Sequence, residues 1–355
     1  MKVLLLGDFS SFFLNLKEAL IELGHSVILA SNGDGSRNID RDIDIGHSQS
    51  KYLSKIKQKI SPLLYRSEFS NHDIVQYINP FYFYARGLPN RSIIKFLIKN
   101  NGGFFISAAG DDSYFWSQGR DALKYGPFDD FLKYDIKKNI YYMERKHCIE
   151  FNKWIVENTD GVIPVMYEYE RSYFDSPKLK QTIPLPINLQ KIKFQSLTGT
   201  GKLVVFHGLS RYGFKGTRHI EEAFNILRHK YKDDLELIIA GNMPIDKYLQ
   251  TMSRASIVID QTNSYSLGMN GIYALAMGKV VLGGAEPESL NSLGISYSPV
   301  FNITPAASSI IKTIEHLLER RSEIPEIGYQ GRVLTETTHC HIKVAEKYLK
   351  IWSNT

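Results

Sequence analysis

The chain has 355 residues, of which 43% are hydrophobic and 12% aromatic. This apolar content is enough for packed cores and excludes an intrinsically disordered protein, and the length suits two domains. Two cysteines, Cys148 and Cys340, cannot form a disulfide framework, so we expect a cytoplasmic protein. The apolar run at residues 3–6 is too short for a signal peptide, and no stretch is long enough to span a bilayer.

The balance of charges indicates an anionic partner. The formal net charge is +6 at neutral pH. Such an excess attracts nucleotide phosphates, an anionic membrane surface or nucleic acid. The sequence contains no zinc-finger spacing, RNA-binding signature or arginine-rich tract, so we expect no nucleic-acid partner.

The first half of the chain alternates short apolar runs with helical patterns. Between the first two runs, Phe13, Leu16, Leu20 and Leu23 recur at helical spacing before Gly24. An order of strand, helix and strand favours a parallel, doubly wound sheet. We therefore predict an N-terminal Rossmann-like domain over residues 1–190, which would bind the acceptor. Its expected buried strands are residues 3–6, 27–30, 74–78, 104–107 and 161–165.

The second half restarts the same pattern after residues 182–202, a linker rich in Pro, Gly and polar residues. We predict a second Rossmann-like domain over residues 200–338, which would bind a nucleotide donor. The amphipathic stretch at residues 339–355 is expected to form a C-terminal helix that packs back on the N-terminal domain, although it could belong to either domain. The expected strands of this half are residues 203–207, 235–240, 256–260 and 279–282.

A basic loop follows the first strand of the second domain. That strand ends near His207, and a helix is expected to begin near Thr217, with Arg211 and Lys215 between them. Fixed cations beside a helix N-terminus form an anion site, because the unsatisfied N–H groups and the helix dipole add to the side-chain charges. The alternative is an ordinary solvated basic loop. The position between strand and helix favours the anion site.

A second loop and helix, within residues 255–288, carry glycines at functional spacing. Gly268 would let the backbone approach a ligand, and the N–H groups of Met269 and Asn270 would point outward from the start of a helix. Glu286 and Glu288 follow the next strand. Simple loop geometry is the alternative explanation for the glycines.

Together these two loops resemble the family-4 glycosyltransferases of GT-B architecture. Arg211 and Lys215, followed by Gly216, are similar to the family's diphosphate element. Gly268 and residues 274–278 (ALAMG) are similar to its second motif, but tyrosines stand at both of that motif's glutamate positions. The resemblance implies an α/β fold of two Rossmann-like parallel-sheet domains facing across a cleft. It also implies a donor diphosphate site at Arg211, Lys215, Gly268, Met269 and Asn270, with Tyr265 and Tyr273 at the nucleoside.

The resemblance also implies candidate residues in the N-terminal domain. Asp111 and Asp112 follow the strand at residues 104–107 and are expected to bind sugar hydroxyls or to activate an acceptor. Helix capping is the alternative role for these two acids. The remaining residues expected to line the cleft are Gly7, Asp8, His207, Glu286 and Glu288.

The function implied is transfer of a sugar from a nucleoside-diphosphate sugar to a saccharide or lipid-linked acceptor, in the synthesis of cell-surface polysaccharide or glycan. The resemblance implies retention of anomeric configuration. We expect no metal and no cofactor beyond the donor, because protein cations would neutralise the diphosphate. Two alternatives stay open. One is a catalytically silent GT-B scaffold or binding protein, and the other is a different sugar-nucleotide enzyme such as an epimerase.

Metal motifs are incomplete in this sequence. Asp40, Asp42 and Asp44 alternate as in a calcium loop, but Ile45 stands where that loop needs glycine and Lys51 where it needs an acid. The His–Cys pairs lack the spacing of a zinc site. We therefore predict no metal site.

A basic amphipathic helix is expected between Lys51 and Ile60. Leu53, Ile56 and Ile60 share one face, and four lysines flank them. Such a helix could attach the protein to the inner face of the plasma membrane. The alternative is an outer helix of the domain with a solvated face.

Overall fold

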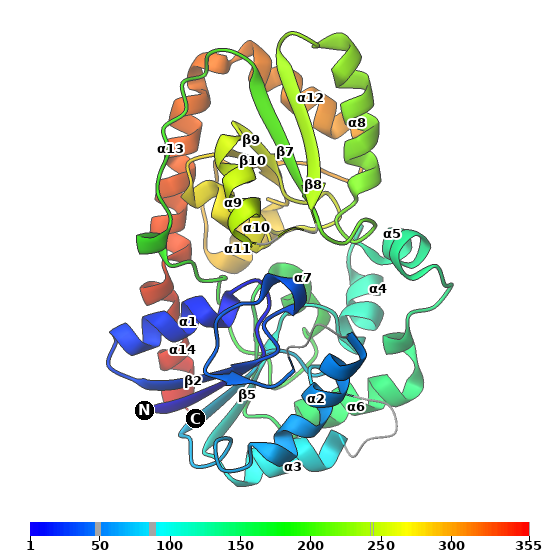
Figure 1. The fold of residues 1–355 in the computed structure, drawn as a ribbon. Helices are drawn as coiled ribbons and strands as arrows, with labels where there is room; N and C mark the ends of the chain where they lie inside the picture. Colours follow the sequence, from blue (N-terminus) through cyan, green and yellow to red (C-terminus); the bar gives the residue numbers. More distant parts are fainter. Residues whose placement is uncertain (47–50, 85–89, 242, 244, 355) are drawn as a thin grey trace.

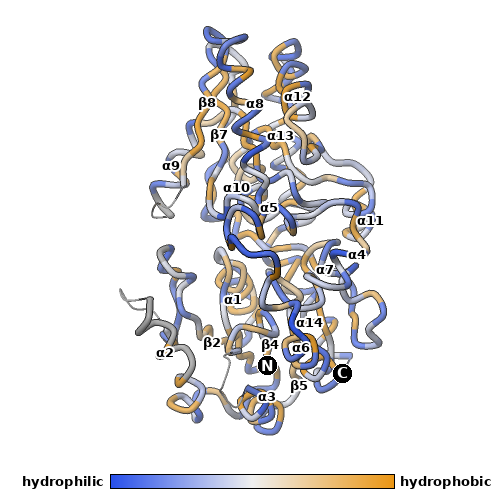
Figure 2. Tube along the Cα trace, turned by 90° about the vertical axis from the view of Figure 1, so that its right-hand side faces the viewer, coloured by the Kyte–Doolittle hydropathy of each residue, from blue (hydrophilic) through white to orange (hydrophobic). Residues whose placement is uncertain are grey.

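The computed structural model describes residues 1–46, 51–84, 90–241, 243 and 245–354. It shows two α/β lobes, one above the other, with the N- and C-termini close together on the first lobe (Figure 1). Hydrophobic residues follow the strands of both sheets, and hydrophilic residues lie on outer helix faces such as that of α8 (Thr217–Lys230) (Figure 2). Each lobe therefore buries its own sheet.

The first lobe is built on a six-stranded parallel sheet with the order β3-β2-β1-β4-β5-β6. All five strands expected in this half are confirmed. Each is buried and therefore appears in the sequence as an apolar run. The sequence pattern missed β3, a two-residue, half-buried strand at the sheet edge. The strands are β1 (Lys2–Leu6), β2 (Ser26–Ser31), β3 (Ile43–Asp44), β4 (Ile74–Tyr77), β5 (Gly103–Ala108) and β6 (Gly161–Pro164).

The longer helices of the first lobe cover the sheet, whereas the segment between β5 and α6 forms only short helical turns. This segment includes the π-helical turns η2 (Phe115–Gly119) and η3 (Phe131–Ile136), and it reaches toward the second lobe. The other helical elements are α1 (Phe12–Glu22), η1 (Gly35–Arg37), α2 (Lys51–Leu64), α3 (Asn90–Lys99), α4 (Arg120–Ala122), α5 (Phe128–Asp130), η4 (Tyr142–Glu144), α6 (Lys146–Glu157), α7 (Tyr167–Ser172) and η5 (Leu189–Lys191).

The second lobe contains a five-stranded parallel sheet with the order β11-β10-β9-β7-β8. The four expected strands are confirmed, and the two-residue edge strand β11 was missed. The strands are β7 (Leu203–Leu209), β8 (Leu235–Gly241), β9 (Ile257–Ile259), β10 (Val280–Gly283) and β11 (Phe301–Asn302). The helices, after α8, are α9 (Ile245–Arg254), α10 (Met269–Ala276), α11 (Pro287–Leu293), α12 (Ala307–Glu319), η6 (Arg321–Glu323), α13 (Ile324–Leu334), η7 (Thr335–His339) and α14 (His341–Ser353).

The strand orders fix where each lobe can bind a ligand. In an open parallel sheet, a crevice forms at the carboxyl ends of the strands where the strand order reverses. That point lies between β1 and β4 in the first lobe and between β7 and β9 in the second. The loops after β7 and β9 contact the first lobe directly. The crevice of the second lobe therefore opens toward the first lobe.

Helix α14 returns from the second lobe and packs against α1 and the first sheet (Figure 1). Tyr348 and Trp352 are buried there, and the Trp352 indole Nε1 donates to Oε1 of Gln76 on β4 at 3.0 Å. The amide of Gln76 in turn donates to the Ser107 hydroxyl on β5 at 2.9 Å. The C-terminal helix is thus tied to two central strands of the first lobe. Within the described residues, none of the helices is both long and apolar enough to cross a bilayer.

The Trp352 contact gives a stability prediction. Trp352→Phe keeps an aromatic ring but leaves Oε1 of Gln76 without its donor, which should lower the free energy of unfolding by about 1–3 kcal/mol. Trp352→Ala also removes buried ring contacts and should cost about 3–5 kcal/mol. Urea unfolding monitored by circular dichroism measures both effects. Ile226→Ala, at an exposed position on α8, is the control and should change stability little. Equal stability of all three variants would contradict the anchoring role.

Candidate functional site

The loop between β7 and α8 is held in place by a buried histidine. Nδ1 of His207 lies 2.9 Å from the carbonyl oxygen of Ile259, and Nε2 lies 3.0 Å from the hydroxyl of Thr217. These contacts tie the end of β7 to the end of β9 and to the first residue of α8. Burial lowers the pKa of His207 to about 4, so the ring is neutral and donates from Nδ1. His207 therefore shapes the predicted anion loop.

Arg211, the first predicted diphosphate ligand, is paired with the other lobe. Its Nη2 lies 2.6 Å from Oδ2 of Asp111. Its guanidinium also stacks over two rings, at 3.7 Å from the centroid of Phe214 and 4.4 Å from that of Phe131. Stacking on rings while bonding a carboxylate is a favourable setting for a planar guanidinium. The structure thus brings Arg211 and Asp111, two predicted site residues, into direct contact.

Lys215, the second predicted ligand, is paired within its own lobe. Its Nζ lies 3.2 Å from Oδ1 of Asp260, a buried residue that directly follows β9. The other carboxylate oxygen of Asp260 accepts the N–H of Gly268 at 2.7 Å. The carboxylate of Asp260 therefore binds both the Lys215 cation and the N-terminus of α10, the two groups predicted to bind the diphosphate. Sequence reasoning missed Asp260, although an acid at the end of a strand beside the reversal of strand order was a usable signal.

The start of α10 contains the other predicted diphosphate ligands. The side chain of Asn270 accepts a hydrogen bond from the Tyr248 hydroxyl, and its Nδ2 is buried without a partner among the described residues. Met269 is also buried. A Cβ at Gly268 would lie 3.5 Å from the nearest atom, Oδ2 of Asp260, and Gly268 has extended backbone geometry. The backbone conformation at this position therefore does not itself require glycine.

The two tyrosines predicted at the nucleoside face the first lobe. Tyr265 stacks on Tyr125 with ring centroids 4.7 Å apart, and its hydroxyl accepts the N–H of Lys124 at 3.0 Å. Tyr273 lies close to the side chains of Asn15 on α1 and of Ser11 just before it, and burial raises the pKa of Tyr273. In this arrangement both side chains contribute to the contact between the lobes. A nucleoside would have to displace protein contacts to reach either hydroxyl.

Glu168 is a further residue of this region that sequence reasoning missed. It lies on α7 of the first lobe, and its buried carboxylate accepts four hydrogen bonds from the loop beside Tyr265. The donors are the N–H groups of Tyr265 and Ser266 at 2.6 and 2.9 Å, the Ser266 hydroxyl at 2.7 Å and the Ser264 hydroxyl. No local pattern marked this residue, because its partners are about a hundred positions away in the chain.

Asp112 does not stand beside Asp111 as a second site residue. It is fully buried, and its two oxygens accept the N–H of Phe115 at 2.8 Å and the Tyr173 hydroxyl at 2.7 Å. Burial raises its pKa to about 6. These contacts stabilise the start of η2, which is the helix-capping role that was the alternative for this residue. Of the acidic pair, only Asp111 meets the predicted diphosphate ligands.

Gly7 and Asp8 also have structural roles at the end of β1. The carboxylate of Asp8 accepts the N–H groups of Phe13 and Leu14, each at 3.1 Å, and so caps α1. Asp8 is fully buried, and burial raises its pKa to about 7. Gly7 has a φ of 94°, and a Cβ there would lie 2.1 Å from Cγ2 of Ile78, so no other residue fits.

Glu286 and Glu288 meet a short stretch of the first lobe. The Tyr125 hydroxyl donates to Oε1 of Glu286 at 2.7 Å, and Lys124 lies 3.6 Å from Glu288. Both acids therefore help to hold the lobes together. Among the described residues, no group of three or more His, Cys, Asp or Glu side chains is arranged to bind a metal ion.

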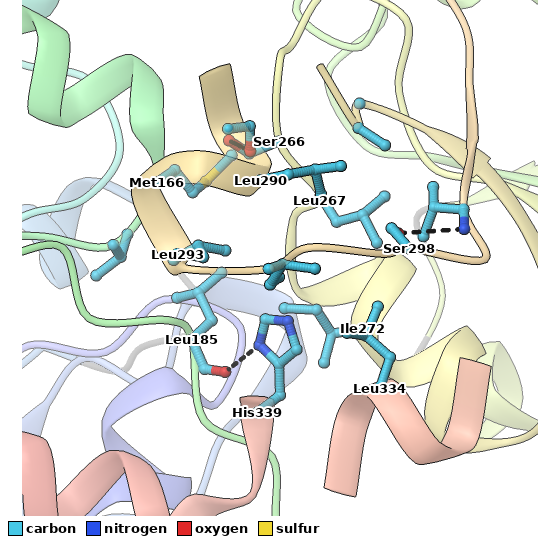
Figure 3. Close-up of a pocket in the computed structure, with 16 residues that line it drawn as sticks. Met166, Leu185, Ser266, Leu267, Ile272, Leu290, Leu293, Ser298, Leu334 and His339 are labelled. Carbon is cyan, nitrogen blue, oxygen red and sulfur yellow. Dashed lines mark hydrogen bonds between the residues drawn. The ribbon is translucent and has the colours of Figure 1, made fainter. Parts of the chain in front are cut away.

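An apolar cavity of about 30 Å³ lies at the same boundary between the lobes (Figure 3). Leu185, Leu267, Ile272 and Leu293 are among the side chains that line it. His339 borders it and bonds through Nδ1 to the carbonyl oxygen of Leu185 at 2.9 Å. None of the residues predicted for the donor site lines this cavity. It is a packing gap beside the connection to α14.

The role of His207 gives a pH-dependent prediction. Its pKa in the fold, about 4, lies below the ordinary value of 6.5, so the stability that the neutral ring contributes is complete above about pH 6.5 and is lost as the pH falls toward 4. His207→Gln can donate to Ile259 and accept from Thr217 without titrating. As the pH falls from about 7 to about 4.5, the wild type should therefore lose roughly 2–3 kcal/mol more unfolding free energy than this variant does. Urea unfolding at both pH values measures the difference. His229→Gln, at an exposed position, should show no such difference from the wild type.

The sequence matches no family model and no characterised protein. Solved structures do match. Sucrose-phosphate synthase from Thermosynechococcus elongatus has a TM-score of 0.63 at 14% identity, covering 100% of this chain and 98% of that one. Anabaena HepE in complex with UDP and glucose has a TM-score of 0.64 at 12% identity, covering 100% of both chains.

A third match is a Listeria monocytogenes protein described as a putative UDP-N-acetylglucosamine 2-epimerase, with a TM-score of 0.56 at 12% identity. It covers 98% of this chain and 94% of that one. At such identities the likeness concerns the fold alone. The two parallel-sheet lobes and these full-length matches together give the chain the GT-B fold.

Proposed function

We propose that this chain is a glycosyltransferase that moves a sugar from a nucleoside-diphosphate sugar to a saccharide or lipid-linked acceptor. The observation that carries the proposal is the position of Arg211 and Lys215. Both lie in the loop that follows β7, at the reversal of strand order in the second sheet. Lys215 shares the carboxylate of Asp260 with the N-terminus of α10, and Arg211 meets the first lobe at Asp111. A crevice of this kind suits a phosphate group. The likeness to HepE, which was solved with UDP and glucose, adds support.

In the proposed reaction, Arg211, Lys215 and the N–H groups at the start of α10 stabilise the negative charge that develops on the departing diphosphate. Preorganised charges of this kind supply a large part of the catalysis in transfer reactions. Asp111, opposite Arg211, would contact a substrate hydroxyl from the first lobe. Retention of configuration, and a role in cell-surface polysaccharide or glycan synthesis, are part of the proposal through the family-4 resemblance alone.

Donor binding requires a change at both cations. Arg211 is neutralised by Asp111 and Lys215 by Asp260, so a diphosphate must exchange with these carboxylates or add to them. The exchange is easier at Arg211, because its partner belongs to the other lobe and can withdraw with it. Asp260 is fixed at the end of β9. We therefore place the first contact of the diphosphate at Arg211.

The diphosphate assignment predicts the effect of removing either cation. Arg211→Ala and Lys215→Ala should each weaken binding of a nucleoside diphosphate by about 1.5–3 kcal/mol, the value of a hydrogen bond to a charged group. Titration calorimetry with a panel of nucleoside diphosphates measures this loss. Lys230→Ala removes an exposed cation of α8 that pairs with Glu315, and it should leave affinity unchanged. Wild-type affinity in both site variants, with intact folds, would reject the assignment.

A second candidate function is a catalytically silent scaffold. Three observations favour it: both cations are already neutralised, Tyr265 stacks on Tyr125, and Tyr273 is largely buried beside α1. The same calorimetric panel separates the two candidates, because a transferase must bind at least one nucleotide and a scaffold none. An epimerase, suggested by the Listeria match, would bind nucleotide and convert the sugar without an acceptor.

We further propose that the first lobe docks on an anionic membrane through α2, where a lipid-linked acceptor would be found. Ile56, Ile60, Leu63 and Leu64 are exposed on this helix at spacings that share one face. The guanidinium of Arg66 lies over the ring of Phe96 on α3, and Lys95 and Lys99 are exposed on that helix. The side chains of Lys51, Lys55 and Lys59 lie outside the described residues. Lys57 pairs with Asp44 at 3.3 Å.

Vesicle flotation tests the docking surface. The wild type should float with vesicles containing anionic lipid, less with zwitterionic vesicles and less as salt rises, because salt screens the attraction. A Leu63→Glu, Leu64→Glu double variant should lose this association. The matched control is Ile226→Glu, which adds a charge at an exposed isoleucine on the other lobe. Absence of flotation at low salt would leave α2 as an ordinary surface helix.

A further inference from the structure

Three carboxylates of the first lobe hold the loop that carries Arg211. They are Asp111, Asp130 and Asp135, which follow β5 or belong to the short helical turns after it. We call these three residues the acidic clasp. They meet the second lobe at the loop and helix start formed by residues 211–219, where the proposed diphosphate site lies.

Asp130 makes the largest number of these contacts. Its Oδ1 accepts from Nε of Arg218 at 2.8 Å, and its Oδ2 accepts from the side-chain amide of Asn263 at 3.3 Å. Nε2 of His219 lies 3.7 Å from the same Oδ2. Asp135 accepts the backbone N–H of Gly213 at 2.5 Å. Carboxylate oxygens thus accept hydrogen bonds from a guanidinium and from a backbone N–H group of this region. These are the kinds of donor that bind phosphate in proteins.

Asp111 is less completely satisfied than Asp130. Its Oδ2 bonds to Arg211, but its Oδ1 is buried and has no hydrogen-bond partner among the described residues. A buried acceptor without a partner costs free energy that is recovered when the group reaches water. The contact therefore neutralises Arg211, but the unsatisfied Oδ1 favours movement of Asp111 into solvent.

We propose that the acidic clasp is an internal competitor for the anion site. It helps to hold the two lobes together while the site is empty, and an incoming diphosphate displaces Asp111 from Arg211. This regulation rests on the proposed function in one respect, since it assumes that Arg211 binds phosphate. A diphosphate carries more negative charge than a carboxylate and offers more acceptor oxygens, so it can outcompete Asp111 for the same guanidinium.

The competition is tested by binding of inorganic pyrophosphate, a probe with no nucleoside. Asp111→Asn removes the competing charge with little change in shape and should tighten pyrophosphate binding about fivefold, the value of a partly exposed ion pair. Arg211→Ala should weaken binding and abolish the gain from Asp111→Asn in the double variant. The control is Asp234→Asn, which breaks another 2.6 Å pair, with Arg321, far from the loop.

The contribution of the clasp to contact between the lobes gives a second measurement. Small-angle X-ray scattering should show a larger radius of gyration for an Asp111→Asn, Asp130→Asn double variant than for the wild type. Equal pyrophosphate affinity of the wild type and Asp111→Asn would overturn the proposal, as would an unchanged radius of gyration in the double variant. If pyrophosphate gives the expected results but no nucleoside diphosphate binds, the clasp stands and the proposed transferase function falls.

Discussion

Arg211 meets Asp111 at 2.6 Å across the boundary between two lobes, and the proposed anion site depends on that pairing. The guanidinium is partly covered by Phe131 and Phe214, so it needs a nearby negative charge. No acid of its own loop supplies that charge, and the first lobe provides it from the turn after β5. The lobes are therefore in contact at the place where their two crevices meet. Any anion that binds this loop must displace the carboxylate of Asp111 or bind beside it.

The boundary between the lobes has two parts that depend on different forces. On the side of the anion loop it is made of carboxylates, cations and backbone N–H groups, which salt, pH or an anion can disturb. Near the connection to α14 it is mainly apolar, around the cavity bordered by Leu185 and Ile272. An apolar contact of this kind does not respond to charge. The polar side is thus the part that can open, and the apolar side near His339 is suited to act as the pivot.

The loop beside Tyr265 shows how one interaction can be supplied from a distant part of the chain. Its backbone N–H groups at Tyr265 and Ser266 are buried and need acceptors. Tyr265 itself offers no carboxylate. Glu168 supplies one from α7 of the first lobe. This interaction makes the conformation of the loop dependent on contact between the lobes.

The sequence by itself determined the architecture. Strands such as β1 and β5 are buried on both faces and appear as continuous apolar runs, and the repeated order of strand and helix fixed two parallel sheets. The edge strands β3 and β11 were not predicted, because a strand of two partly exposed residues produces no hydrophobic pattern in the sequence. The sequence also placed Arg211 and Lys215 between a strand and a helix. Only the tertiary structure decided their partners, since Asp111 lies a hundred positions from Arg211 and belongs to another lobe. It likewise decided that Asp112 caps a turn and that Tyr273 faces α1. The periodicity of hydrophobic residues indicates which face of a helix or strand is buried. Charge pairing between the lobes depends instead on how the two sheets are oriented relative to each other, and no local sequence pattern contains that information.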